Sequence, residues 1–135
     1  MKIKLLMVCC LLSIHLSADL LSEGADASQK GDLNKALTLW GKACTEGSAK
    51  ACDKQGSMYY FGYGVKQDQI KAKDLYLKAC DSGVAEDCAK VAKMYHYGYT
   101  VKEDKAKALD FYKKACDLGD GESCKNRDQL LRSVN

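Results

Sequence analysis

Residues 78–88 read KACDSGVAEDC, in which two cysteines flank a glycine within otherwise helical sequence. Seven residues separate Cys80 from Cys88. Two thiols at this spacing could form part of a metal site, a redox pair or a disulfide bridge. The rest of the chain helps to decide between these possibilities, because the same pattern occurs twice more.

The pattern recurs with a period of 36 residues. Residues 32–52 (DLNKALTLWGKACTEGSAKAC), 68–88 (DQIKAKDLYLKACDSGVAEDC) and 104–124 (DKAKALDFYKKACDLGDGESC) superimpose at this spacing, and both cysteines coincide in all three. Residues 54–68 and 90–104 also match, sharing Met, Tyr, Gly, Tyr, Val, Lys and Asp. A period of this length indicates a repeat architecture, in which each unit buries its apolar face against its neighbours.

Each unit predicts two helices. In the first helix of the middle unit, apolar residues follow a helical period at Ala72, Leu75, Tyr76, Ala79 and Cys80. An aspartate heads this helix in every unit, where its carboxylate can accept a free backbone N–H, and a glycine marks its end. The second helix also ends at a glycine. The capping residues are Asp32, Asp68 and Asp104, and the glycines are Gly47, Gly83, Gly119, Gly62 and Gly98.

We therefore predict an all-α fold, an α/α solenoid of about seven helices, with no strands. In the last unit Arg127 and Asp128 replace the apolar Val91 and Ala92 of the middle unit, as expected of a polar cap at the end of a solenoid. The predicted organisation is a leading helix at 19–31 and repeats at 32–67, 68–103 and 104–135.

The N-terminal segment, residues 1–18, has the layout of a secretory signal peptide. Two lysines precede an apolar run of about 12 residues, and small residues end at Ala18. A helix that spans a membrane needs about 20 apolar residues, so we expect no transmembrane segment. Cys9 and Cys10 would be removed with the signal. The protein is therefore expected to be secreted or periplasmic.

The mature chain would be close to neutral. The whole chain has 21 Lys and Arg against 18 Asp and Glu, and cleavage after Ala18 removes two lysines and no acid, which leaves 19 against 18. An evenly mixed surface gives no electrostatic footprint for nucleic acid or an anionic membrane. Nucleic acid is therefore not an expected partner.

The six remaining cysteines are interpreted as structural disulfides. Each pair joins the last turn of one predicted helix to the first turn of the next, positions that face each other in a helical hairpin. Such bridges persist in the oxidising compartments that exported proteins reach. A zinc site would need closer ligand spacing and a thioredoxin-like pair would be C-x-x-C, so we expect no metal and no cofactor. The repeat predicts the pairs Cys44–Cys52, Cys80–Cys88 and Cys116–Cys124.

These units resemble Sel1-like repeats, which are TPR-related helical repeats of about 36 residues. Lys66 and Lys102 depart from the family pattern, which often has Pro after the Val. The C-x7-C in every unit makes the chain similar to the Helicobacter cysteine-rich protein family, secreted Sel1-like proteins with one bridge per repeat. The stretch MYYFGYGVKQDQIKAKDLYLKACDSG (58–83) carries the repeat pattern at Tyr59, Gly62, Gly64, Val65, Asp68, Lys71, Ala72, Tyr76, Ala79 and Gly83.

The resemblance to this family implies penicillin binding with weak beta-lactamase activity, a hydrolase function. The residues give it little support, because the chain lacks S-x-x-K, S-D-N and K-T-G, the motifs of serine beta-lactamases. A metallo-type site would need several histidines, and His96 is the single one after residue 18. The sequence therefore leaves open whether the protein is an enzyme, and it identifies no catalytic residue.

A stripe on the second helices is the candidate ligand groove, because the corresponding helix of TPR-like stacks lines the concave surface. The expected ligand is a protein, a peptide or a peptidoglycan-like fragment. The family resemblance implies a beta-lactam as a further ligand. A non-catalytic binding scaffold is the alternative to the hydrolase, and a solvated helix face is the alternative to a groove. The stripe comprises Lys54, Ser57, Phe61, Lys90, Lys93, Tyr97 and Asn126.

Further expectations concern individual side chains and the oligomeric state. His96 aligns with Tyr60 and Arg132 in the other units, so we expect a variable surface position rather than a catalytic base. Within the groove, Ser57 is the hydroxyl that could act as a nucleophile beside a lysine. A short array of three units is expected to be a monomer or to dimerise weakly through an end face. The aromatic residues expected to pack between helices are Trp40, Tyr76 and Tyr112.

Overall fold

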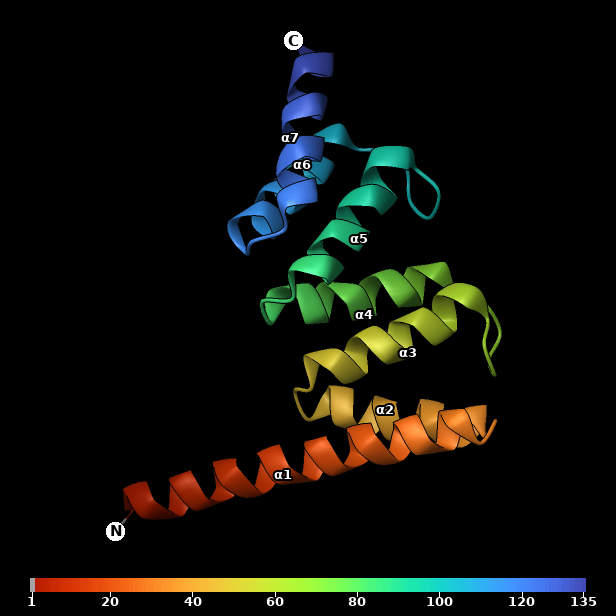
Figure 1. Cartoon of the computed structure of the whole chain (residues 1–135), viewed down its shortest axis with the longest axis vertical. Coiled ribbons are helices and arrows are strands. Elements are labelled where there is room, and N and C mark those ends of the chain that lie inside the picture. Colours follow the sequence, from red (N-terminus) through yellow and green to blue (C-terminus); the bar gives the residue numbers. More distant parts are fainter. Residues whose placement is uncertain (1) are drawn as a thin grey trace.

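The computed structural model describes residues 2–135, with side chains from residue 15 onward, as a stack of helices (Figure 1). Seven helices and no strands occur over this range, so the predicted all-α solenoid is confirmed. The two ends of the array lie far apart (Figure 1). The helices are α1 (Lys2–Gln29), α2 (Leu33–Thr45), α3 (Ala49–Phe61), α4 (Gln69–Asp81), α5 (Ala85–Tyr97), α6 (Lys105–Asp117) and α7 (Gly121–Val134).

The first helix contains residues 2–18 of the segment predicted to be a signal peptide. The side chains of residues 1–14, including those of Cys9 and Cys10, lie outside the described part of the chain. Within the described part, no helix combines the length and the hydrophobicity that crossing a membrane requires. Cleavage of the segment therefore stays a prediction.

The helices begin and end at the residues that the repeat singles out. Asp32, Asp68 and Asp104 each accept a hydrogen bond from the backbone N–H three residues further on, at 3.1, 2.9 and 3.0 Å. The glycines after α2, α4 and α6 have φ angles of 99°, 94° and 103°, a left-handed conformation that favours glycine. Local capping therefore fixes the length of each first helix.

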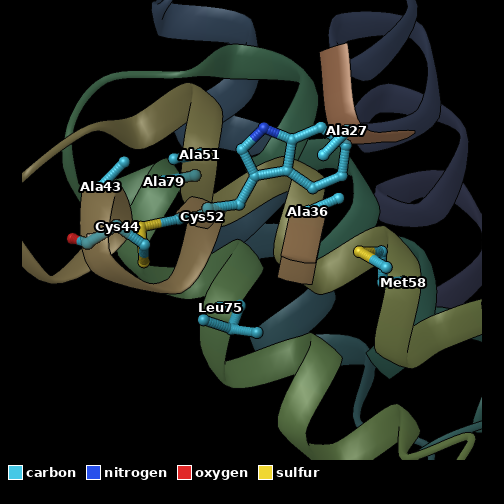
Figure 2. Close-up of a cluster of buried hydrophobic side chains, with 10 residues drawn as sticks. Ala27, Ala36, Ala43, Cys44, Ala51, Cys52, Met58, Leu75 and Ala79 are labelled. Carbon is cyan, nitrogen blue, oxygen red and sulfur yellow. Dashed lines mark hydrogen bonds between the residues drawn. A yellow bond between two sulfur atoms is a disulfide. The ribbon is translucent and has the colours of Figure 1, made fainter. Parts of the chain in front are cut away.

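Small side chains allow the helices to approach closely. The alanines at positions 36, 72 and 108 and those at 43, 79 and 115 are fully buried. In the N-terminal part of the array Ala36, Ala43 and Ala79 belong to one buried cluster, in which Ala43 and Ala79 lie near the first disulfide and Ala36 lies nearer to Ala27 (Figure 2). Trp40, Tyr76 and Tyr112 are also buried, in agreement with their predicted packing role.

The first helix is anchored by Trp40. The indole N–H donates a hydrogen bond to the backbone oxygen of Leu21 at 3.2 Å. Gly24 faces the same indole ring, and a β-carbon at this position would overlap with it. The close approach therefore depends on a glycine in α1, and it holds the C-terminal half of α1 against α2.

Three disulfides connect consecutive helices with the predicted pairing. Cys44–Cys52 joins α2 to α3, Cys80–Cys88 joins α4 to α5, and Cys116–Cys124 joins α6 to α7. Their Cα atoms lie 4.6 to 4.8 Å apart. The three bridged helix pairs share less packing surface than the pairs α1/α2, α3/α4 and α5/α6. Each bridge therefore reinforces one of the weaker junctions.

The loops after α3 and α5 have the same conformation. Gly62 and Gly98 cap the two helices in the left-handed conformation, with φ of 74° and 65°. Each loop then returns to its helix, since the amide of Asp68 donates to the oxygen of Tyr59 at 2.8 Å and that of Asp104 to Tyr95 at 2.9 Å. This conformation presents an exposed tyrosine after each helix.

The last helix, α7, carries polar groups at positions that are apolar in the middle repeat. Arg127 donates from Nε to Asp128 Oδ1 at 2.9 Å. Its Nη1 also lies 3.4 Å from Sγ of Cys116. The arginine therefore covers the third disulfide with a charged side chain.

We predict that the double substitution Cys80→Ala and Cys88→Ala lowers the free energy of unfolding by about 2 to 3 kcal/mol, because the bridge closes a nine-residue loop that restricts the unfolded chain. Urea unfolding followed by circular dichroism measures this change. Reduction of the variant should then remove further stability through the two remaining bridges, and an unchanged unfolding midpoint in the double variant would contradict the prediction.

Candidate functional site

The C-terminal ends of α3 and α5 form an aromatic cleft, a half-open cavity of about 340 Å³. Three of its aromatic side chains are largely exposed, namely Phe61 (57%), Tyr97 (52%) and Tyr99 (75%). The rings of Tyr97 and Tyr99 stack with centroids 5.5 Å apart. The residues that line the aromatic cleft are Ser57, Tyr60, Phe61, Tyr76, Lys90, Lys93, Met94, Tyr97 and Tyr99.

A second cavity, the acidic cleft, adjoins the first between α5 and α7. Its volume is about 540 Å³, and it shares Lys90 and Lys93 with the aromatic cleft. The two lysines therefore form the divide between two adjoining clefts, which together are called the groove. The acidic cleft is lined by Ala85, Glu86, Ala89, Lys90, Lys93, Leu118, Gly119, Asp120, Glu122, Ser123 and Asn126.

Lys90 is the centre of a charged network that links α3 to α5. Its Nζ contacts Asp53 Oδ1 on α3 at 2.5 Å, Glu86 Oε1 at 3.1 Å and Asp87 Oδ1 at 3.4 Å. Nζ also lies 4.9 Å from the centroid of the Tyr76 ring, a cation–π contact. Lys90 is thus held in place, whereas Lys93 is half-exposed and contacts Glu122 at a longer 3.6 Å.

Asp87 is the buried acid of this network, with 1% of its surface exposed. Burial, together with the negative charge of Asp53, raises its pKa to about 7, and Lys90 offsets this shift only in part. Burial lowers the pKa of Lys90, but the hydrogen bond to Asp53 and the charges of Asp87 and Asp53 outweigh it, so that the pKa is raised. Lys90 therefore stays an ammonium, while Asp87 titrates near neutral pH.

Ser57 lies on the floor of the aromatic cleft, where its hydroxyl is 3.2 Å from that of Tyr76. Burial raises the pKa of Tyr76, with a smaller opposing effect of the hydrogen bond to Ser57, so the tyrosine keeps its proton at neutral pH. The neighbouring Lys90 is also protonated. Neither group is therefore a general base for Ser57.

His96 differs from the expected variable surface position. It is half-buried, its Nδ1 lies 3.2 Å from the hydroxyl of Tyr112, and its ring stacks on Tyr97 at 4.4 Å. The imidazole thereby supports one of the exposed rings of the aromatic cleft. The Tyr112 partner could not be inferred from the sequence, because it lies on the next helix, α6.

The structure brings most of the predicted stripe together. Ser57, Phe61 and Tyr97 line the aromatic cleft, and Asn126 lines the acidic cleft. Lys54 is exposed on α3 and, in the described part of the chain, lines neither cleft. Sequence reasoning missed the lining residues Tyr60, Tyr76, Met94 and Tyr99 and the network residues Asp53, Glu86 and Asp87.

One sequence signal could have identified Asp87. The corresponding residues of the other units are Ala51 and Ser123, both buried. An acid in a register of small buried residues departs from the repeat, and such a departure points to a special role at that position. By contrast, among the described residues no group of three His, Cys, Asp or Glu side chains could hold a metal ion.

Comparison with known families identifies the repeat. The model of the Sel1 repeat matches residues 11–48, 49–84 and 85–120. These ranges correspond to the extensively packed pairs α1/α2, α3/α4 and α5/α6. The first two disulfides therefore each join the end of one matched unit to the start of the next, and the third joins the last matched unit to α7. A comparison with curated proteins found no match.

Several solved structures are similar. A protective antigen of uropathogenic Escherichia coli with an SLR fold has a TM-score of 0.77 and 22% identity over 88% of this chain and 26% of that one. A Sel1 repeat protein from Oxalobacter formigenes has a TM-score of 0.74 and 23% identity over 82% of this chain and 47% of that one. This chain thus spans about a quarter and about half of their respective lengths.

A third similar structure is cysteine rich protein B of Helicobacter pylori. Its TM-score is 0.66, with 24% identity over 82% of this chain and 96% of that chain. At these identities the three structures establish the fold.

We predict that Asp87→Asn changes how stability depends on pH. Because the pKa of Asp87 is raised, the folded state favours the neutral carboxyl. The stability that this preference contributes is complete below about pH 4 and is lost as the pH rises to about 7. The asparagine variant cannot ionise, so it should gain stability relative to the native chain between pH 4 and pH 8. Urea midpoints at both pH values test this, and a constant difference between the two proteins would contradict it.

Proposed function

Because the chain belongs to the Sel1 repeat family, we propose that it is a non-catalytic, exported scaffold that binds a polypeptide in the groove of α3, α5 and α7. The observation that carries this proposal is the exposure of the aromatic cleft. Phe61, Tyr97 and Tyr99 together present apolar rings at one site. Gathered apolar surface of this kind on a folded protein indicates a place where a partner binds.

The architecture supports a polypeptide as the ligand. Solenoid repeats use the extended surfaces that stacked units create for binding. Exposed aromatic side chains next to charged groups are typical of interface anchors, because a ring buries much area with little loss of side-chain freedom. The lysine divide adds fixed charge in the middle of the groove, which can orient a ligand.

Export is supported by the covalent structure. Disulfides persist in oxidising compartments and are rare in the cytosol, and this chain carries three in a short array. The N-terminal sequence has the layout of a signal peptide. These features support our proposal that the protein is periplasmic or secreted.

The penicillin hydrolysis implied by the family resemblance has less support from the geometry. Ser57 is the candidate nucleophile of the aromatic cleft, but Tyr76 and Lys90 both keep their protons at neutral pH. A serine becomes a nucleophile only when a neighbouring base accepts its proton. The same cleft is well suited to binding without chemistry.

The proposal predicts that the oxidised protein selects peptides from a random library displayed on phage. Tyr97→Ala should reduce retention of the selected peptides about tenfold, because it removes one anchor ring from the aromatic cleft. Leu131→Ala is the matched control, since Leu131 is exposed on α7 outside both clefts. Selection of no peptides, or of peptides that bind both variants equally, would overturn the proposal.

Incubation with a fluorescent penicillin addresses catalysis. We expect neither a covalent adduct on denaturing gels nor turnover of the drug. An adduct that Ser57→Ala abolishes would show that the groove is catalytic and would contradict a pure binding role.

A further inference from the structure

We propose that the groove accommodates a proline-rich segment in the polyproline II conformation, with a basic residue at the end that enters the acidic cleft. This inference rests on the proposed polypeptide-binding function and names its ligand class. It follows from the hydrogen-bonding groups, the ring geometry and the charges of the two clefts.

The polar groups of the aromatic cleft are rich in donors. They are the hydroxyls of serine and tyrosine and the ammonium group of Lys93, while the ammonium group of Lys90 already contacts three carboxylates. Among the described residues, no carboxylate or amide side chain lines this cleft. An ammonium donates and cannot accept, while a hydroxyl can do both. A suitable ligand therefore offers acceptors and few donors.

A proline-rich segment has this composition. Proline lacks the backbone N–H, and the polyproline II helix makes no internal hydrogen bonds, so its carbonyl groups are free to accept. A β-strand ligand would need a sheet edge with which to pair. The groove offers no such edge, because helices form its walls and their backbone groups are bonded internally.

The rings are arranged to hold such a segment. Tyr97 stacks on Tyr99 with an angle of 22° between the rings, so a pair of roughly parallel rings lines the aromatic cleft together with Phe61. Aromatic-lined grooves bind proline-rich segments, which are already ordered and lose little entropy on binding. The cavity of about 340 Å³ has room for a few residues.

The carboxylates of the acidic cleft favour a basic residue next to the prolines of the ligand. Glu86, Asp120 and Glu122 line the acidic cleft against two lysines. Lys90 is already surrounded by Asp53, Glu86 and Asp87, so its charge is more than compensated. Glu122 is largely exposed and contacts Lys93 at 3.6 Å, which leaves it available to a cation from the ligand.

The test uses synthetic peptides and the oxidised full chain. The probes are fluorescent, end-capped peptides of eight prolines and one arginine, with the arginine at either end. Control peptides replace the prolines with alanines or the arginine with glutamate. Fluorescence polarisation should show binding of at least one arginine probe and at least about tenfold weaker binding of its two controls, because each change removes one major contact.

Variants of the protein test whether the peptide binds in the groove. Tyr99→Ala should weaken binding of the arginine probe about tenfold. Tyr63→Ala is the matched control, since Tyr63 is the equivalent loop tyrosine one repeat earlier and is not among the residues that line either cleft. Glu122→Gln should weaken binding of the arginine probe without affecting a probe of prolines alone.

The outcomes separate this inference from the proposed function. Equal binding of proline and alanine peptides, or a preference for the glutamate peptide, would overturn the inference. Phage-selected peptides that bind the groove but lack prolines would also overturn it, while the scaffold function would stand. If neither the phage peptides nor the probes bind, both proposals fail.

Discussion

The stacking of the helices depends on three disulfides, each of which joins two consecutive helices in a hairpin. Each disulfide connects two helices that share less surface than the helices of the more extensively packed pairs. A short array with an alanine-rich core has little apolar area to bury at these junctions, so packing alone would hold them weakly. The bridge closes a short loop and restricts the unfolded chain, which stabilises the junction without additional core volume. Consecutive helix pairs are thereby held in one register, and α3, α5 and α7 can form a continuous groove.

The charged network around Lys90 includes an acid at a position where the repeat otherwise has a small buried residue. Asp87 occupies a position that holds alanine or serine in the other units, and its burial is opposed to its ionisation. Lys90 compensates in part and links Asp87 to Asp53 on the neighbouring helix. Buried ionisable groups often cost stability and occur preferentially at functional sites. Lys90 lines both clefts, whereas Asp87 and Asp53 line neither, so Lys90 is the residue that connects this buried network to the groove.

Much of the fold could be predicted because the repeat is local. Asp68 caps a helix three residues from the amide it binds, and Gly83 ends the same helix, so short-range chemistry defines the element. The pairing of Cys80 with Cys88 follows from the same hairpin. The site was predictable in part. Ser57, Phe61 and Tyr97 were found from helical periodicity, whereas Tyr99 was missed because it lies in a loop outside that period.

The sequence by itself determined the repeat length, the helical class, the helix ends and the disulfide pairing, since all of these depend on residues close together in the chain. The tertiary structure decided which side chains share a cavity. Lys90 and Asp53 are 37 residues apart and meet because α3 and α5 both pack against α4, and His96 meets Tyr112 because α5 packs against α6. These contacts depend on the angle and separation of stacked helices. Packing of the buried alanines and aromatic rings sets both quantities, and the periodicity of the sequence does not specify them.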